Sequence, residues 1–235
     1  MTAEQQHGKS FEALVKQSSG LFPKAANLKI KHTAIFDIPG EFTEDSIPAS
    51  IKLAKCDLAT GTQPTLGLSD ARRFYQCTTS GTMRLIAGIY APASSLINVY
   101  TIHDMIITPE MKTILWGDLE AEDIHEFSDR IAEWSKKDSD SGIRKRTNAQ
   151  RLAKRYKGIL MQRGGIVSLN QKINSTNHRL QCSVNLTHLR AACRDKGNSF
   201  STFSGFSGDK RSYGLLSLPL AMSAGRRGAG TRALA

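Results

Sequence analysis

The stretch from residue 33 to residue 55, TAIFDIPGEFTEDSIPASIKLAK, constrains the fold more than any other part of this sequence. One apolar run ends at Asp37, and Pro39 and Gly40 follow shortly after it. A second apolar run begins after a polar, acidic bend. Proline cannot donate to a strand ladder and glycine favours a turn, so the pattern predicts two strands with a short connection. This arrangement would bring Asp37 and Lys52 side by side at one end of a sheet.

A carboxylate beside an ammonium group on neighbouring strands suits metal-dependent hydrolysis. Asp37 would hold a divalent cation, while Lys52 would orient or deprotonate the attacking water and face a phosphate. The alternative is a surface ion pair between adjacent strands with no chemical role. The pair alone does not decide between these two interpretations.

The overall composition is that of an ordinary globular protein. The chain has 235 residues, of which 40% are hydrophobic, so it can bury a core as one large domain or as a core with an appendage. The N-terminal segment MTAEQQHGKS is polar, and no apolar run approaches the roughly 18 residues that a bilayer span needs. We therefore expect a cytoplasmic protein without a membrane partner.

The four cysteines form no CxxC pair, and a cytosolic setting argues against disulfides. A group of histidines and cysteines between residues 178 and 193 invites a zinc interpretation. However, Leu180, Cys182 and Val184 alternate as in a half-buried strand, which favours a core position for Cys182.

Charge is distributed unevenly along the chain, whose formal net charge is +11. Residues 104–140 are acidic, whereas residues 141–194 contain many lysines and arginines and no carboxylate. Such a region is typical of proteins that bind a phosphate backbone, although a solvated basic face or an anionic membrane or protein partner would be the alternatives. The residues expected to contact nucleic acid are Lys55, Arg72, Arg73, Arg144, Lys145, Arg146, Arg151, Lys154, Arg155, Arg163, Gln171 and Lys172.

Hydrophobic periodicity predicts alternating helices and strands. We expect a loop at residues 57–67, a helix capped by Ser69, and a small-residue, basic and disordered tail at residues 223–235. The expected strands are residues 27–36, 47–55, 83–90, 96–102, 166–169 and 180–186. The other expected helices are residues 3–17, 109–114, 120–137 and 147–160, and residues 186–193 are expected to form a short helix or turn.

The N-terminal half resembles a known nuclease core. A helix with GKSFEALVK, a strand ending in IFD, a strand with SIK and a following helix are similar to the core of type II restriction endonucleases of the PD-(D/E)xK superfamily. The resemblance covers residues 8–102. The acidic helix, the basic helix and the segments GGIVSLNQKI and RLQCSVNL that follow are similar in layout to small monomeric members.

This resemblance implies roles for individual residues. Asp37 matches the metal-binding acid, Lys52 the catalytic lysine and Glu12 the helix glutamate near the metal. Ser50 stands where the superfamily pattern has an acid, so Glu12 or Glu41 would have to supply the second carboxylate. The implied catalytic set is Glu12, Asp37, Ser50 and Lys52, and the implied Mg²⁺ ligands are Glu12, Asp37, Glu41 and the carbonyl of Ile51.

The expected fold class is therefore α/β. A restriction-endonuclease-like core with a mixed central sheet flanked by helices would occupy residues 1–137, and a basic α+β DNA-binding region would occupy residues 138–222. The expected function is Mg²⁺-dependent, sequence-specific cleavage of double-stranded DNA in restriction-modification, by a monomer or a homodimer. The alternatives are a nucleic-acid-binding protein with a degenerate, inactive core, and a resolvase or repair nuclease that reads DNA structure.

Overall fold

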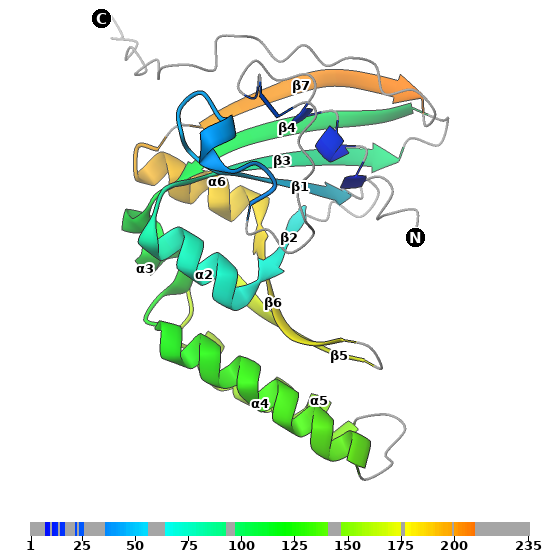
Figure 1. Cartoon of the computed structure of the whole chain (residues 1–235), viewed down its shortest axis with the longest axis vertical. Coiled ribbons are helices and arrows are strands. Elements are labelled where there is room, and N and C mark those ends of the chain that lie inside the picture. Colours follow the sequence, from blue (N-terminus) through cyan, green and yellow to red (C-terminus); the bar gives the residue numbers. More distant parts are fainter. Residues whose placement is uncertain are drawn as a thin grey trace, which may run out of the picture.

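The structure, a computed structural model, is an α/β assembly with two sheets (Figure 1). The main sheet has the strand order β1-β3-β4-β7 and the small sheet the order β2-β6-β5. The described residues are 8–9, 11–13, 15–16, 22, 24–25, 36–55, 64–92, 97–140, 147–174, 177–198 and 200–209.

The main sheet is mixed. Its first two strands, β1 and β3, are parallel, and the other neighbours are antiparallel. Parallel neighbours need a crossover connection, and here this connection contains strand β2 and helix α2. The main-sheet strands are β1 (Ala49–Lys55), β3 (Met83–Pro92), β4 (Ile97–Ile107) and β7 (Phe200–Asp209).

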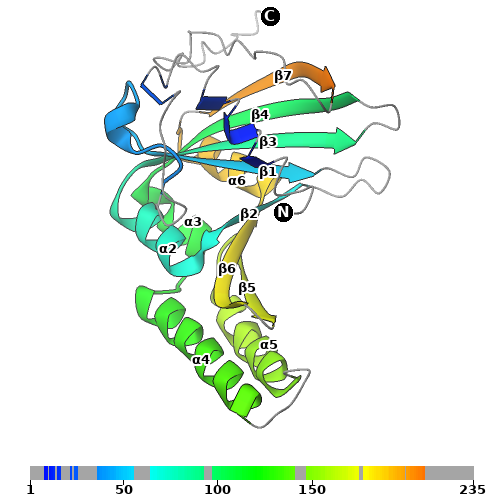
Figure 2. The same ribbon diagram turned by 45° about the vertical axis from the view of Figure 1, so that its right-hand side comes forward.

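The small sheet is antiparallel and lies between the main sheet and the helix pair α4 and α5, which run side by side (Figure 2). Its strands are β2 (Thr65–Asp70), β5 (Val167–Asn174) and β6 (Asn177–Asn185). The helices are η1 (Gly40–Phe42), α2 (Ala71–Ser80), η2 (Pro109–Met111), α3 (Lys112–Trp116), α4 (Ala121–Asp140), α5 (Thr147–Met161) and α6 (Leu186–Asp195).

Alternating side chains of the main sheet contribute to two separate cores. On one face, Leu85 and Ala87 of β3 pack with the helices and the small sheet. On the other face, Ile86 packs with Phe11 from the N-terminal helical residues. This second contact is close, because a Cβ atom on Gly88 would lie 2.4 Å from Phe11 Cζ. Glycine at this position therefore lets the N-terminal segment pack directly on the strand.

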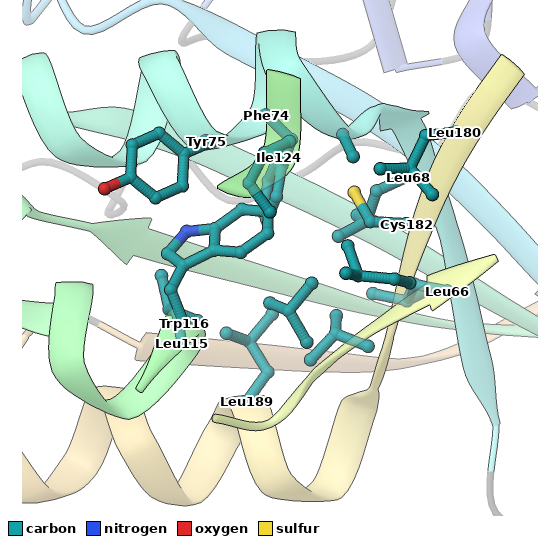
Figure 3. Packing of buried hydrophobic residues seen from close by; sticks show 14 of the residues in the cluster. Leu66, Leu68, Phe74, Tyr75, Leu115, Trp116, Ile124, Leu180, Cys182 and Leu189 are labelled. Carbon is teal, nitrogen blue, oxygen red and sulfur yellow. The ribbon is translucent and has the colours of Figure 1, made fainter. Parts of the chain in front are cut away.

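The larger core is centred on Trp116 (Figure 3). Its ring packs against Tyr75 and Phe74 of α2, at centroid distances of 5.1 and 5.9 Å. The indole Nε1 donates to Thr78 Oγ1 at 3.0 Å, which satisfies a buried polar group. These contacts fix α2 against α3 and so support β1 and β3 from one side.

The opposite face of the main sheet contains a buried ion pair. Arg84 of β3 donates through Nη1 to Asp104 Oδ2 of β4 at 3.0 Å, and through Nη2 to Asp45. Its backbone N–H also donates to the carbonyl of Pro48 at 2.8 Å. Arg84 therefore links Asp45, in the connection between Asp37 and β1, to strands β3 and β4 in the middle of the sheet.

Several predicted boundaries are corrected by the structure. The predicted loop at residues 57–67 ends earlier, because Thr65 already begins β2. Ser69 is not the helix cap, since β2 continues through it and the Asp70 carboxylate accepts from the N–H groups of Arg72 and Arg73. The predicted strands at residues 166–169 and 180–186 correspond to the longer β5 and β6, but Ile166 precedes β5 and Leu186 already begins α6. The expected strand at residues 27–36 lies outside the described residues apart from its last position.

The strand predicted at residues 96–102 extends to Ile107, because the polar side chains of His103 and Asp104 are buried within it. Burial and nearby Arg190 lower the pKa of His103 to about 4. Burial raises the pKa of Asp104 to about 6, although Arg84 opposes this shift. Polar residues thus continue the strand inside the protein, where the sequence suggested its end.

Two strands cross the boundary that the sequence favours at residue 137. β2, from the N-terminal part, pairs with β6, and β7, from the C-terminal part, pairs with β4. Each sheet therefore contains strands from both parts of the chain. None of the helices in the described part has the length and apolarity that a bilayer crossing requires.

The cysteine interpretation favoured by the sequence is confirmed for Cys182. Its side chain is fully buried, and its Sγ lies 3.7 Å from the carbonyl oxygen of Ser69. Burial raises its thiol pKa, and burial also raises the pKa of Cys193 to about 11. Both thiols are therefore protonated core groups at neutral pH.

Candidate active site

The structure brings Asp37 and Lys52 together at one edge of the main sheet. Asp37 Oδ2 accepts from Lys52 Nζ at 3.0 Å, from the backbone N–H of Ile51 at 2.6 Å and from Ser50 Oγ at 3.1 Å. The Asp37 and Lys52 side chains are 28% and 23% exposed. The pair is therefore held by strand geometry but remains accessible to solvent.

The local backbone explains this convergence. Ile38 and Ala49 exchange both of their backbone hydrogen bonds, at 3.0 and 2.8 Å, in an isolated antiparallel bridge. The N–H and C=O groups of one strand residue point to the same side, and this side alternates along the strand. Because Ala49 and Ile51 are two residues apart, both face the edge away from β3, and the Ile51 N–H accordingly meets Asp37. The carbonyl of Ile51 points to that same edge.

The second carboxylate oxygen of Asp37 is not used in this network. Among the described residues, Oδ1 accepts no hydrogen bond, whereas Oδ2 accepts three. Asp37 Oδ1 and the Ile51 carbonyl are hard oxygen donors at one edge of β1, where the Asp37 side chain is partly exposed, and oxygen is the donor type that Mg²⁺ prefers. These two groups fit a cation site in part.

Ser50 and Lys52 project from the same face of β1, since strand side chains alternate. Ser50 is 7% exposed, and its hydroxyl is a hydrogen-bond donor to Asp37. An acid at this position would instead add a second negative oxygen ligand. The serine therefore orients the single carboxylate but does not replace the charge that the superfamily pattern carries there.

The other two predicted carboxylates are not joined to this group. Glu12 lies on the N-terminal helix and accepts from Lys16 Nζ at 2.5 Å, one helical turn along. Glu41 is exposed in η1. No group of three or more histidine, cysteine or acidic side chains that could hold a metal ion occurs within the residues that the structure describes. The second carboxylate ligand is thus not identified by the geometry.

The predicted DNA-contacting residues differ in whether a carboxylate of the described residues pairs with them. Arg72 and Arg163 are engaged by the acidic helix α4, through ion pairs with Asp129 and with Asp123 Oδ2, the latter at 2.6 Å. By contrast, the described residues provide no ion pair for Arg151, Lys154, Arg155 and Lys172, which are exposed. Lys55 and Arg73 are also exposed, whereas Arg144, Lys145 and Arg146 lie outside the described residues.

The acidic helix α4 pairs with Arg72 and Arg163, and it also contacts helix α5. Asp138 near its C-terminal end is buried and accepts from the N–H of Ala149 at 2.9 Å, which satisfies a free donor in the first turn of α5. Helix α5 is fixed against α4 by this contact. Its exposed arginines and lysine consequently belong to an ordered helix.

Sequence reasoning did not identify Arg84 as the partner of both Asp104 and Asp45. The available signal was a charged residue inside each of two apolar runs, MRLIAGIY and IHDMII, because a buried charge requires a partner. Gln171, which the sequence suggested as a DNA contact, is half-buried, and the register pairs it with Leu180 on the core side of the small sheet.

Comparison of the chain with protein-family models, curated proteins and solved structures finds no match. The functional interpretation consequently rests on the residues themselves.

Proposed function

We propose that this protein is a Mg²⁺-dependent endonuclease that cleaves double-stranded DNA. The observation that carries the proposal is the convergence of Asp37, the Ile51 backbone and Lys52 at one accessible strand edge. The antiparallel bridge from Ile38 to Ala49, followed by the parallel pair β1 and β3, is compatible with the restriction-endonuclease-like core that the sequence resembles.

The residues divide the chemistry between them. Phosphodiester hydrolysis requires a positioned water and stabilisation of the charge that develops on the phosphoryl oxygens. Asp37 Oδ1 and the Ile51 carbonyl would hold Mg²⁺, with water completing its shell. The bound cation would supply charge neutralisation at the phosphate. Lys52 Nζ, already 3.0 Å from Asp37 Oδ2, would donate to the attacking water or to a phosphate oxygen.

Substrate binding would use the exposed basic side chains of α5 and the small sheet. These residues belong to the part of the sequence without a carboxylate, and counterion release from the DNA backbone favours such a surface. Sequence-specific cleavage of the type II restriction kind is the finer form of the proposal. It predicts discrete fragments from plasmid DNA, whereas a nuclease that reads DNA structure would act at junctions or flaps.

The decisive experiment is a plasmid-nicking assay with purified full-length protein. Nicking should require Mg²⁺ and should be lost in both Asp37→Ala and Lys52→Ala, while Lys196→Ala, an exposed lysine after α6, should cut as the unmodified protein does. Cutting by the protein with both substitutions would overturn the assignment.

A second candidate is a nucleic-acid-binding protein without catalysis. Ser50 favours it, because a hydroxyl stands where a second carboxylate would bind the cation, and Glu12 is paired with Lys16. This candidate predicts duplex binding that is independent of Mg²⁺ and unchanged in Lys52→Ala, together with no nicking at any Mg²⁺ concentration.

A further inference from the structure

Strands β5 and β6 form an antiparallel ribbon whose two faces differ. The inner face contains the buried residues Leu169, Leu180 and Cys182, which belong to the larger core. Because side chains alternate along a strand, the residues between these positions form the opposite, outer face. In the observed register, the outer face consists of directly opposed pairs: Ser168 with Ser183, Asn170 with Gln181, and Lys172 with Arg179.

The pair of Lys172 and Arg179 is unfavourable in the free protein. Like charges directly opposite each other in an antiparallel pair repel, and both side chains are exposed. Neither has a carboxylate partner within the described part of the chain, and neither strand contains an acid. Such a pair is stabilised when an anion binds over it.

The neighbouring pair consists of amides in defined positions. Asn170 Nδ2 donates to Ser183 Oγ at 2.7 Å, and Gln181 Nε2 donates to the carbonyl of Leu68 at 3.1 Å. Asn170 Nδ2 also donates to the carbonyl of Ser168 at 3.4 Å, so Asn170 keeps its carbonyl oxygen for a ligand. Within the described residues, Gln181 keeps both its carbonyl oxygen and a second N–H. The outer face therefore presents, in order along the ribbon, hydroxyl, amide and basic pairs, with no apolar side chain among them.

We propose that this outer face enters the major groove of duplex DNA, with Lys172 and Arg179 on backbone phosphates and Asn170 and Gln181 on base edges. This inference rests on the proposed function and assigns its substrate-reading surface. A two-stranded ribbon fits the major groove, where amide side chains pair with adenine and basic groups with phosphates. A protein partner fits less well, because protein interfaces are anchored by apolar and aromatic residues.

The first experiment measures duplex binding by the full-length protein in EDTA, so that cleavage does not interfere. The probe is a fluorescently labelled duplex of random sequence, titrated at several salt concentrations. Lys172→Ser and Arg179→Ser should each weaken binding by about fivefold to tenfold near 0.1 M salt and reduce the salt slope by about one. The matched control Lys196→Ser, which removes an exposed lysine after α6, should leave both quantities unchanged.

The second measurement separates ligand binding from a structural role. Lys172→Ser removes the like-charge repulsion, so the melting temperature should rise by about 1–3 °C while duplex affinity falls. A variant that merely damages the ribbon would lose both stability and affinity. A lower melting temperature in both Lys172→Ser and Arg179→Ser would therefore contradict the proposal.

The third measurement concerns the amide pair. Duplexes are selected from a random pool by binding to the unmodified protein or to the double variant Asn170→Ala/Gln181→Ala, without Mg²⁺. The unmodified protein should enrich a preferred sequence, and the double variant should lose the preference at one or two positions while keeping its salt slope. Identical enrichment by both proteins would remove the amides from base reading and overturn this assignment.

The outcomes distinguish this inference from the proposed function. If the protein never nicks DNA but the serine variants weaken duplex binding, the nuclease assignment fails and the ribbon assignment stands. If nicking occurs but both serine variants bind with the unmodified affinity and salt slope, the ribbon assignment alone fails. Tighter binding of polyglutamate than of the random duplex would overturn it in favour of an acidic protein partner.

Discussion

Two carboxylates, Asp37 beside the edge strand β1 and Asp104 within β4, each pair with a basic side chain but have opposite surroundings. Asp37 is 28% exposed and its Oδ1 accepts no hydrogen bond from the described residues, whereas Asp104 is 10% exposed. Asp104 Oδ1 and Arg84 Nε are buried without a hydrogen-bond partner in the described part of the chain. The pair of Asp37 and Lys52 can therefore accept a ligand, whereas the pair of Asp104 and Arg84 links neighbouring strands.

The largest expected effect concerns the partly exposed ion pair of Asp37 and Lys52. Asp37→Asn keeps an oxygen acceptor for the Ile51 N–H but removes the negative charge, so nicking should fall by at least about 100-fold. The melting temperature should change by less than about 2 °C, because partly exposed ion pairs contribute little to stability. Nicking rate and thermal unfolding are measured on the same preparation. Equal losses of stability and activity would show that Asp37 is structural.

The buried pair should respond in the opposite way. Arg84→Met leaves Asp104 buried without its cation, and breaking a buried pair from one side costs about 3–5 kcal/mol. For a chain of this size, the melting temperature should fall by roughly 10 °C. Lys137→Met, which breaks an exposed pair with Glu133, is the control and should change it by less than about 2 °C. If the melting temperature falls by similar amounts in the two variants, the buried pair does not contribute more to stability than the exposed pair.

The pH dependence of stability provides a finer test of the buried side chains. The folded pKa of Asp104 is raised to about 6, so the native state binds the extra proton and stability falls as pH rises from about 4 to 6. The folded pKa of His103 is lowered to about 4, so stability instead rises with pH between about 4 and 6.5. The two contributions oppose each other in nearly the same range.

Single variants should therefore reveal the hidden contributions. In Asp104→Asn, the free energy of unfolding should increase with pH between about 4 and 6.5, by about 2 kcal/mol, because only the His103 contribution remains. In His103→Gln, it should decrease with pH over about 4 to 6. Urea denaturation at closely spaced pH values measures both slopes. Parallel curves for the two variants would contradict the opposing assignments.

Much of the fold follows from patterns within single segments. The apolar positions Ile124, Phe127 and Ile131 predict α4, and these side chains are fully buried in the structure. Strand β7 was not recognised, because its phenylalanines at 203 and 206 are three residues apart and do not match the strand period of two. A register shift between Tyr100 and Thr101 pairs Phe203 and Phe206 with positions of β4 that are two residues apart. Such a bulge cannot be read from one strand alone.

The candidate site was predictable to the extent that it is local. Asp37 and Lys52 lie on adjacent segments with a turn signal between them, so their proximity follows from the sequence. The partners of Arg84 and the orientation of Gln171 depend instead on which strands pair and in what register. That information comes from the packing of distant segments, because a shift by one residue would exchange the two faces of a strand.

The smallest expected effect concerns Ser50, which stands where the superfamily pattern has an acid, beside the partly exposed pair of Asp37 and Lys52. Ser50→Asp would add a carboxylate on the face that carries Lys52, next to Asp37 Oδ2, which Ser50 Oγ now contacts at 3.1 Å. Without a cation the two negative charges repel, so the variant should be slightly less stable in EDTA. With Mg²⁺ the added oxygen ligand should lower the concentration for half-maximal nicking by about tenfold, which corresponds to about 1.4 kcal/mol. Ser50→Asn, similar in size but uncharged, should not lower it. If Ser50→Asp requires as much Mg²⁺ as the unmodified protein, the cation does not bind beside Ser50.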